Sequence, residues 1–100
     1  MSDAAEIESL WLVEATYAPN AAETRKPFRA EHLARLLDLK DAGVIVEVGA
    51  FMDVSASIAL VRAESEAAAL AVCRDDAYMR NGIWVELRAR PFGRVVRGSG

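Results

Sequence analysis

The sequence contains little of the chemistry from which proteins build disulfides and metal sites. Its 100 residues include one cysteine, Cys73, and one histidine, His32. A single cysteine excludes an intramolecular disulfide and a zinc site made of several thiolates. With one histidine as well, a transition metal would need carboxylates as its remaining ligands, so we expect no metal. Cys73 follows a run of alanine and leucine and is predicted to be a small core side chain.

Long apolar runs, an excess of positive charge and cofactor motifs are missing too. No apolar run approaches the length of a membrane span, and the acidic N-terminus lacks the pattern of a signal peptide, so we expect a cytoplasmic protein. The net charge of −3, from 12 basic and 15 acidic residues, gives no support for a nucleic-acid partner. No phosphate-binding glycine loop, other cofactor fingerprint or nucleophilic serine or cysteine pattern is visible, so we expect no cofactor.

Apolar side chains, in contrast, are abundant and make up 53% of the residues. One hundred residues suffice for one domain with its own core. We predict that domain over residues 7–97, after a flexible tail over residues 1–6. A chain this apolar either has an unusually complete core or covers part of its surface in an oligomer, and composition alone leaves both open.

The spacing of apolar residues and turn residues predicts an α+β fold. Four segments have the alternation or the β-branched composition of strands: residues 7–17, 44–51, 57–63 and 83–92. Two have the periodicity of helices: residues 28–42, ended by Gly43, and residues 64–74, capped by Ser65. This order is the ferredoxin-like β-α-β-β-α-β unit, whose four-stranded antiparallel sheet carries both helices on one face.

The second face of the predicted sheet is left uncovered. Alternation along the last strand puts Trp84 on that face, opposite to Ile83 and Leu87. Pro91 is expected to close the strand, and Gly49 indicates a bulge or the close approach of another group. Because an apolar, uncovered face needs a partner, and a symmetric dimer is the commonest solution, we expect a homodimer that could pair further.

The first predicted helix carries the single histidine on its apolar side, in an arc that contains His32, Leu33, Leu36 and Leu37. Arg29 and Arg25 precede His32 by one and two turns, whereas Arg35 is expected on the opposite side, facing water. Burial and two neighbouring guanidinium groups both oppose protonation, so we expect a neutral imidazole that can accept a proton. The alternative is a half-buried histidine that is hydrogen-bonded only to backbone.

Short motifs along the chain resemble those of the YCII-related (YciI-like) family of small α/β proteins. They are residues 29–33 (RAEHL), Gly43 and Gly49, then residues 76–78 (DAY), Gly82 and residues 90–92 (RPF), similar to the family's Asp-Pro-Tyr segment and closing Pro-Phe. The match runs from Leu10 to Val96. Ala50 and Ala77 stand where the family has proline, so the backbone beside the matching residues is held less rigidly.

The resemblance implies a dimeric ferredoxin-like domain within the group of dimeric α+β barrels. Family members carry a histidine and an aspartate proposed as an active-site pair, which here would be His32 and Asp76. One branch includes a dehydrochlorinase that acts on a chlorinated hydroxyquinol, and the wider group includes muconolactone isomerases. The resemblance therefore implies a cofactor-independent lyase or isomerase that takes a proton from a small anionic or phenolic cyclic substrate.

Such a pair, with its basic neighbours, suits proton abstraction. A carboxylate bonded to one imidazole nitrogen fixes the tautomer and makes the other nitrogen a better base. Arg29, and less directly Arg25, could then bind an anionic group. Tyr78 is either a hydrogen-bond donor or a packed aromatic, and Ser57 is either a strand residue or a minor binding residue. Asp76 could equally be only a helix cap, in a non-catalytic dimeric small-ligand-binding or accessory module.

Overall fold

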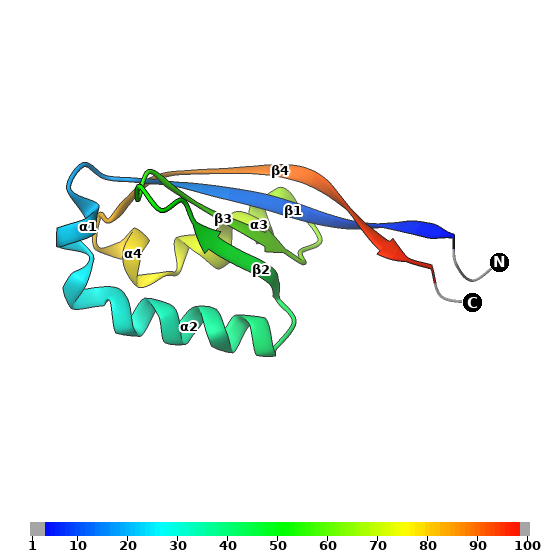
Figure 1. Cartoon of the computed structure of the whole chain (residues 1–100), viewed down its shortest axis with the longest axis horizontal. Helices are drawn as coiled ribbons and strands as arrows, with labels where there is room; N and C mark the ends of the chain where they lie inside the picture. Colours follow the sequence, from blue (N-terminus) through cyan, green and yellow to red (C-terminus); the bar gives the residue numbers. More distant parts are fainter. Residues whose placement is uncertain (1–3, 99–100) are drawn as a thin grey trace.

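The computed structural model describes residues 4–98, and within them four strands form one antiparallel sheet with the helices on one side (Figure 1). The strands are β1 (Ala5–Tyr17), β2 (Ile45–Ala50), β3 (Ala56–Val61) and β4 (Trp84–Arg97), in the spatial order β2-β3-β1-β4. The helical segments are α1 (Ala21–Thr24), the 3₁₀ turn η1 (Lys26–Phe28), α2 (Arg29–Asp41), α3 (Glu66–Arg74) and α4 (Ala77–Arg80). The predicted α+β class and β-α-β-β-α-β order are confirmed, with three short helical turns around the two long helices.

Strands β1 and β4 are longer than predicted and form a two-stranded ribbon that extends past the rest of the sheet (Figure 1). β1 begins at Ala5, inside the segment expected to be a tail, and residues 1–3 of that tail lie outside the described part of the chain. β4 runs through Pro91 to Arg97, so the prediction that Pro91 closes the strand is wrong. Because β4 is an edge strand, one side of its backbone has no strand beside it, and a residue without an N–H can be accommodated.

Trp84 faces the helices, so its predicted place on the uncovered face is wrong. Thr16 pairs with Glu86 and Tyr17 pairs with Trp84, which leaves Val85 as the extra residue of a β-bulge. The bulge reverses the alternation: Trp84 is 3% exposed, whereas Val85 is 55% exposed. Counting alternate residues cannot detect such an insertion, because the count assumes an unbroken period of two.

The core lies between the sheet and the helices and contains many small side chains. Val13, Ala15 and Tyr17, which alternate along β1 and so share one face, enter it from that strand. Buried small residues such as Ala59 of β3 and Ala69 of α3 let the helix lie close to the strands. Helix α3 covers β1 and β4, whereas α2 lies over β2 and next to α4 (Figure 1). No helix among residues 4–98 is long and apolar enough to cross a membrane.

The ends of the long helices follow the sequence signals, whereas the glycine inside β2 does not. Gly43, just after α2, has a φ of 78°, a left-handed conformation that favours glycine. Ser65 caps α3 through a side-chain oxygen that accepts a backbone hydrogen bond. The prediction for Gly49 is wrong, because a Cβ there would meet no atom within 4 Å and the irregular register of β2 falls between Ile45 and Glu47.

Candidate active site

Helix α2 turns His32 toward the core and its leucines toward a cavity. Of the α2 residues, all of which the structure describes, His32 alone is buried. Leu33 and Leu37 are exposed, although the sequence places them in one apolar arc with His32. Both leucines line an open cavity whose other wall is formed by β2 and the turn after it. The arc is therefore divided between the protein core and a surface that a ligand can reach.

Asp76 begins helix α4 and meets His32 in the interior. It is 0% exposed. Its Oδ2 accepts a hydrogen bond from the backbone N–H of Tyr78 at 2.9 Å, which caps α4, and one from His32 Nδ1 at 2.6 Å. Because a charged carboxylate can only accept, Nδ1 carries the proton and Nε2 is the basic ring nitrogen. Asp76 is thus both a helix cap and the partner of His32.

Arg35 completes the surroundings of Asp76, and the expectation that it faces water is wrong. Its Nη1 donates to Asp76 Oδ1 at 3.1 Å, and its Nη2 donates to the Val72 carbonyl near the end of α3 at 2.6 Å. The sequence does contain a signal for this contact, because Arg35 lies three residues after His32 and so on the same side of α2. A long side chain at that spacing can reach the same partner.

The surroundings of Asp76 favour its charged form. Burial alone would raise the pKa of this carboxyl, but hydrogen bonds from His32, the Tyr78 amide and Arg35 outweigh burial and lower the pKa below its usual range. Burial, with a smaller effect of the Asp76 charge, raises the pKa of Cys73 to about 11. Cys73 is therefore a protonated core thiol, as its neighbours in the sequence predict.

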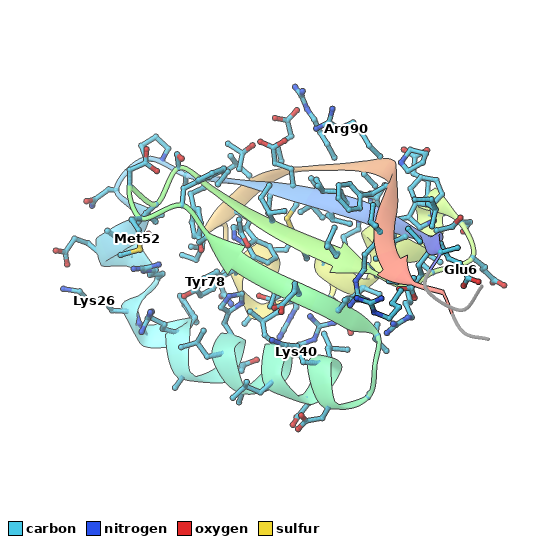
Figure 2. All side chains as sticks on the ribbon, turned by 45° about the vertical axis from the view of Figure 1, so that its right-hand side comes forward. Glu6, Lys26, Lys40, Met52, Tyr78 and Arg90 are labelled. Atoms are coloured by element: carbon cyan, nitrogen blue, oxygen red, sulfur yellow. The ribbon has the colours of Figure 1, made fainter. Side chains whose placement is uncertain are left out.

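Three aromatic side chains hold the imidazole ring in place. The Tyr78 ring is stacked on His32, with centroids 3.6 Å apart and 9° between the planes, and Trp84 meets His32 edge-on at 5.3 Å. Tyr17 meets both Tyr78 and Trp84 edge-on. Figure 2 shows Tyr78 between α2 and the sheet. With its plane set by these rings and Nδ1 bound to Asp76, His32 has little freedom to rotate.

A cavity of about 530 Å³ opens beside the imidazole. It brings together His32 and the four residues predicted to bind substrate: Arg25, Arg29, Ser57 and Tyr78. Asp76 and Arg35 are not among its lining residues in the described chain, so they would act on a ligand only through His32. The remaining lining residues are mostly apolar and include Leu33, Leu36, Leu37, Val48, Phe51, Met52 and Val54. Phe51 is a wall of the cavity, and the binding roles of the four predicted residues remain predictions.

Two buried polar groups of the site have no hydrogen-bond partner within the described residues, the Tyr78 hydroxyl and Trp84 Nε1. Leaving such a group without a partner costs about 1–3 kcal/mol. Burial and Tyr17 raise the pKa of Tyr78 against the opposing effect of Arg25 and Arg29, so the hydroxyl keeps its proton and can donate a hydrogen bond. Among residues 4–98, no three His, Cys, Asp or Glu side chains are grouped so that they could hold a metal ion.

The fold and the site together define a small ferredoxin-like α+β domain with a buried histidine–aspartate pair beside an open cavity. A family model for the YCII-related domain matches residues 9–93, and the chain belongs to that family. This is the family that its short motifs resemble. No curated protein matches the chain significantly.

Among solved structures that match the chain is one with the same fold, at a TM-score of 0.71. It is 5-chloro-2-hydroxyhydroquinone dehydrochlorinase (TftG) from Burkholderia phenoliruptrix AC1100, in complex with 2,5-dihydroxybenzoquinone. The match covers 83% of this chain and 92% of that chain, at 22% sequence identity. At this identity the likeness establishes a common architecture, and the chemistry has to be argued from the residues of this chain.

Proposed function

We propose that the protein is a cofactor-independent lyase or isomerase that removes a proton from a small anionic or phenolic cyclic substrate. One observation carries the proposal. His32 Nδ1 is bound to the fully buried Asp76 at 2.6 Å, while the same imidazole lines the cavity. With Nδ1 occupied, Nε2 is the nitrogen left to meet a ligand. An oriented base beside a ligand cavity is the arrangement that proton abstraction requires.

In this proposal Nε2 of His32 takes a proton from a C–H or O–H of the bound ring. The positive charge that develops on the imidazole is stabilised by Asp76, whose own charge is supported by Arg35. The electron pair left by the proton either expels a leaving group from the ring, which is an elimination, or moves a double bond, after which the imidazolium returns the proton elsewhere. The first outcome makes the protein a lyase and the second an isomerase.

The cavity residues supply the binding part of the proposal. Arg29 and Arg25 provide positive charge for an anionic or phenolate oxygen, with Arg29 one helical turn from His32. Tyr78 lines the cavity, and its buried hydroxyl, which has no partner among residues 4–98, suits an oxygen on which negative charge develops. Ser57 donates its hydroxyl proton to the Gly49 carbonyl at 3.1 Å, so toward a ligand it offers an acceptor.

The TftG structure supports the choice of reaction class. That protein is a dehydrochlorinase and was solved with 2,5-dihydroxybenzoquinone, an oxygenated six-membered ring. Dehydrochlorination consists of proton removal and loss of chloride, which is the elimination branch of the mechanism proposed here. Family membership and this likeness favour the enzyme over the non-catalytic binding or accessory module.

The proposal includes a homodimer in the cytoplasm. The sheet face away from the helices carries an apolar groove, lined among others by Leu12, Ile58, Leu60 and Phe92. Figure 2 shows Arg90 projecting from the same, uncovered side of the sheet, so polar groups flank the groove. An apolar strip with a polar border is the composition expected of an interface between subunits.

The test compares wild type with His32→Gln on a panel of halogenated hydroxyquinols and unsaturated lactone acids. Chloride release and exchange of ring protons with deuterated solvent, followed by NMR, report the two branches. Loss of the base should lower kcat by about 10²–10⁴-fold. Lys40→Gln changes a cavity residue about two helical turns from His32 and keeps the base. It is the control for general damage to the cavity. A His32→Gln protein with the full rate would rule out the mechanism.

A further inference from the structure

The cavity beside His32 extends along α2 well beyond the reach of one small ring. Its α2 wall runs from Arg29 to Lys40. At about 1.5 Å per residue this distance is about 16 Å. A six-membered ring with a substituent atom at each end is about 6 Å across, at about 1.5 Å per bond. A single ring placed at His32 would therefore occupy less than half of the wall.

The two ends of the cavity differ in chemistry. The end near the start of α2 holds Arg25, Arg29 and the unpartnered Tyr78 hydroxyl. Toward the other end the lining is apolar, with leucines of α2 and Val48 of β2: Leu33, Leu36, Leu37 and Val48. The β2–β3 turn, with Met52, lies at the arginine end (Figure 2). Among the leucines, Leu37 is strongly exposed, at 62%. Exposed apolar side chains gathered beside a polar site are typical of a ligand groove.

The charge at the far end of the groove is already compensated. Lys40, the last α2 residue of the wall, donates to Glu47 of β2 at 3.1 Å. This pairing closes the apolar stretch with a neutral ion pair and leaves the arginines as the anion-binding end. The groove therefore has one polar end and one apolar end, in fixed order along the helix.

We infer that the substrate is amphipathic, an acidic or phenolic ring that carries an apolar substituent of about three to five carbons or a fused second ring. This inference rests on the proposed function, because it places the reacting ring at His32. The acidic oxygen lies toward Arg29 and Tyr78, and the substituent lies between Leu37 of α2 and Val48 of β2. The substituent covers apolar side chains that a bare ring would leave in water.

The inference can be tested by calorimetric titration with salicylate and its 4- and 5-alkyl derivatives from methyl to butyl. A fully buried methylene improves affinity about fourfold, and one against a groove open on one side about twofold. A butyl group adds four carbons, so we expect Kd to fall about 16-fold from salicylate to the better butyl isomer in wild type. In Leu37→Ser the same comparison should give a gain of about threefold or less. Val85→Ser removes an equally exposed apolar side chain far from the cavity and should keep the wild-type gain.

Three results would overturn the inference. In the first, Kd shows no gain with chain length in either alkyl series. In the second, no member of the series binds measurably. In the third, Leu37→Ser changes the sedimentation coefficient of the protein, which would make the apolar end a contact between protein chains. Failure of the proposed function has a different signature: His32→Gln keeps full turnover, while the dependence of Kd on chain length is unaffected. The two proposals can therefore fail separately.

Discussion

At the scale of single residues, Asp76 shows how one side chain can serve the fold and the site together. Its Oδ2 caps α4 through the Tyr78 amide and also accepts from His32, while its Oδ1 accepts from Arg35. A cap at this position sets where α4 begins and so places Tyr78 for stacking on the imidazole. The backbone that positions the ring and the charge that orients it thus depend on the same carboxylate.

Asp76→Asn tests this dependence through the pH dependence of stability. The pKa of folded Asp76 is lowered, so its ionic contribution is present above the ordinary value of about 3.9 and is lost as pH falls through the folded value. We expect Asp76→Asn to cost about 1–3 kcal/mol of unfolding free energy near pH 5, and the difference from wild type to shrink below about pH 4. Urea unfolding at several pH values measures this difference. Asp75→Asn, at the exposed neighbour, should be nearly neutral, and a difference that persists unchanged to pH 3 would contradict the assignment.

At the scale of elements, Arg35 joins three helices. It starts on α2, donates to the Val72 carbonyl of α3 and donates to the residue that caps α4. The fork of a guanidinium can make both bonds at once, whereas an ammonium group has one donor centre. The position of α2 relative to the other two helices, and so of His32 relative to Asp76, is fixed in part by this side chain.

Arg35→Met should therefore impair the base without affecting ligand binding. We expect a loss of about 2 kcal/mol in stability, from two charge-assisted hydrogen bonds, and a rise in the pKa of Asp76. With a substrate in hand, kcat should fall while Kd for a ring acid stays the same, because Arg35 does not line the cavity in the described chain. NMR titration of the Asp76 carboxyl measures the pKa directly. Arg35→Lys should bring the pKa of Asp76 part of the way back to its wild-type value. An effect of Arg35→Met on Kd alone would show that Arg35 acts on the ligand and not on the base.

The elements also show what could be predicted from the sequence. Alternation groups Val13, Ala15 and Tyr17 on one face of β1 but does not show that this face is the core. Ser65 and Gly43 marked helix ends because capping is a local property. Trp84 was placed on the wrong face because a bulge depends on how two distant strands pair. Arg35 was placed in solvent because charge alone does not show where a long side chain ends.

The candidate site could be predicted only in part, for related reasons. Helical spacing put Arg25, Arg29 and His32 on one line, and the cavity does contain all three. The partner Asp76 lies 44 residues further along the chain, and it was the resemblance to a family, not any local pattern, that connected it to His32. Long-range pairing of this kind is set by tertiary packing, which periodicity does not report.

At the scale of the whole molecule, the two faces of the sheet have different surroundings. The face toward α2 and α3 is filled by the core. The opposite face has no helix over it in the described chain (Figure 1). Leu12, Ile58 and Leu60 remain there as half-buried apolar side chains. The groove for the proposed substrate substituent lies on the helix side. The molecule therefore presents two apolar surfaces that meet at the β2 edge, where residues 48–51 line both, and we propose a different occupant for each.

The two surfaces can be distinguished by testing which of them forms the interface of the proposed homodimer. We expect wild type to sediment as a dimer through the open sheet face, and Leu60→Lys to weaken the dimer by about 30-fold or more, because a lysine there must be desolvated at the centre of the interface. Leu60 is half-exposed in the monomer, so the variant should still fold, which circular dichroism checks. Leu37→Lys makes the same change on the helix side and should remain dimeric. A monomeric wild type would contradict the proposal, and dissociation by Leu37→Lys alone would place the interface on α2 and leave the sheet face open to solvent.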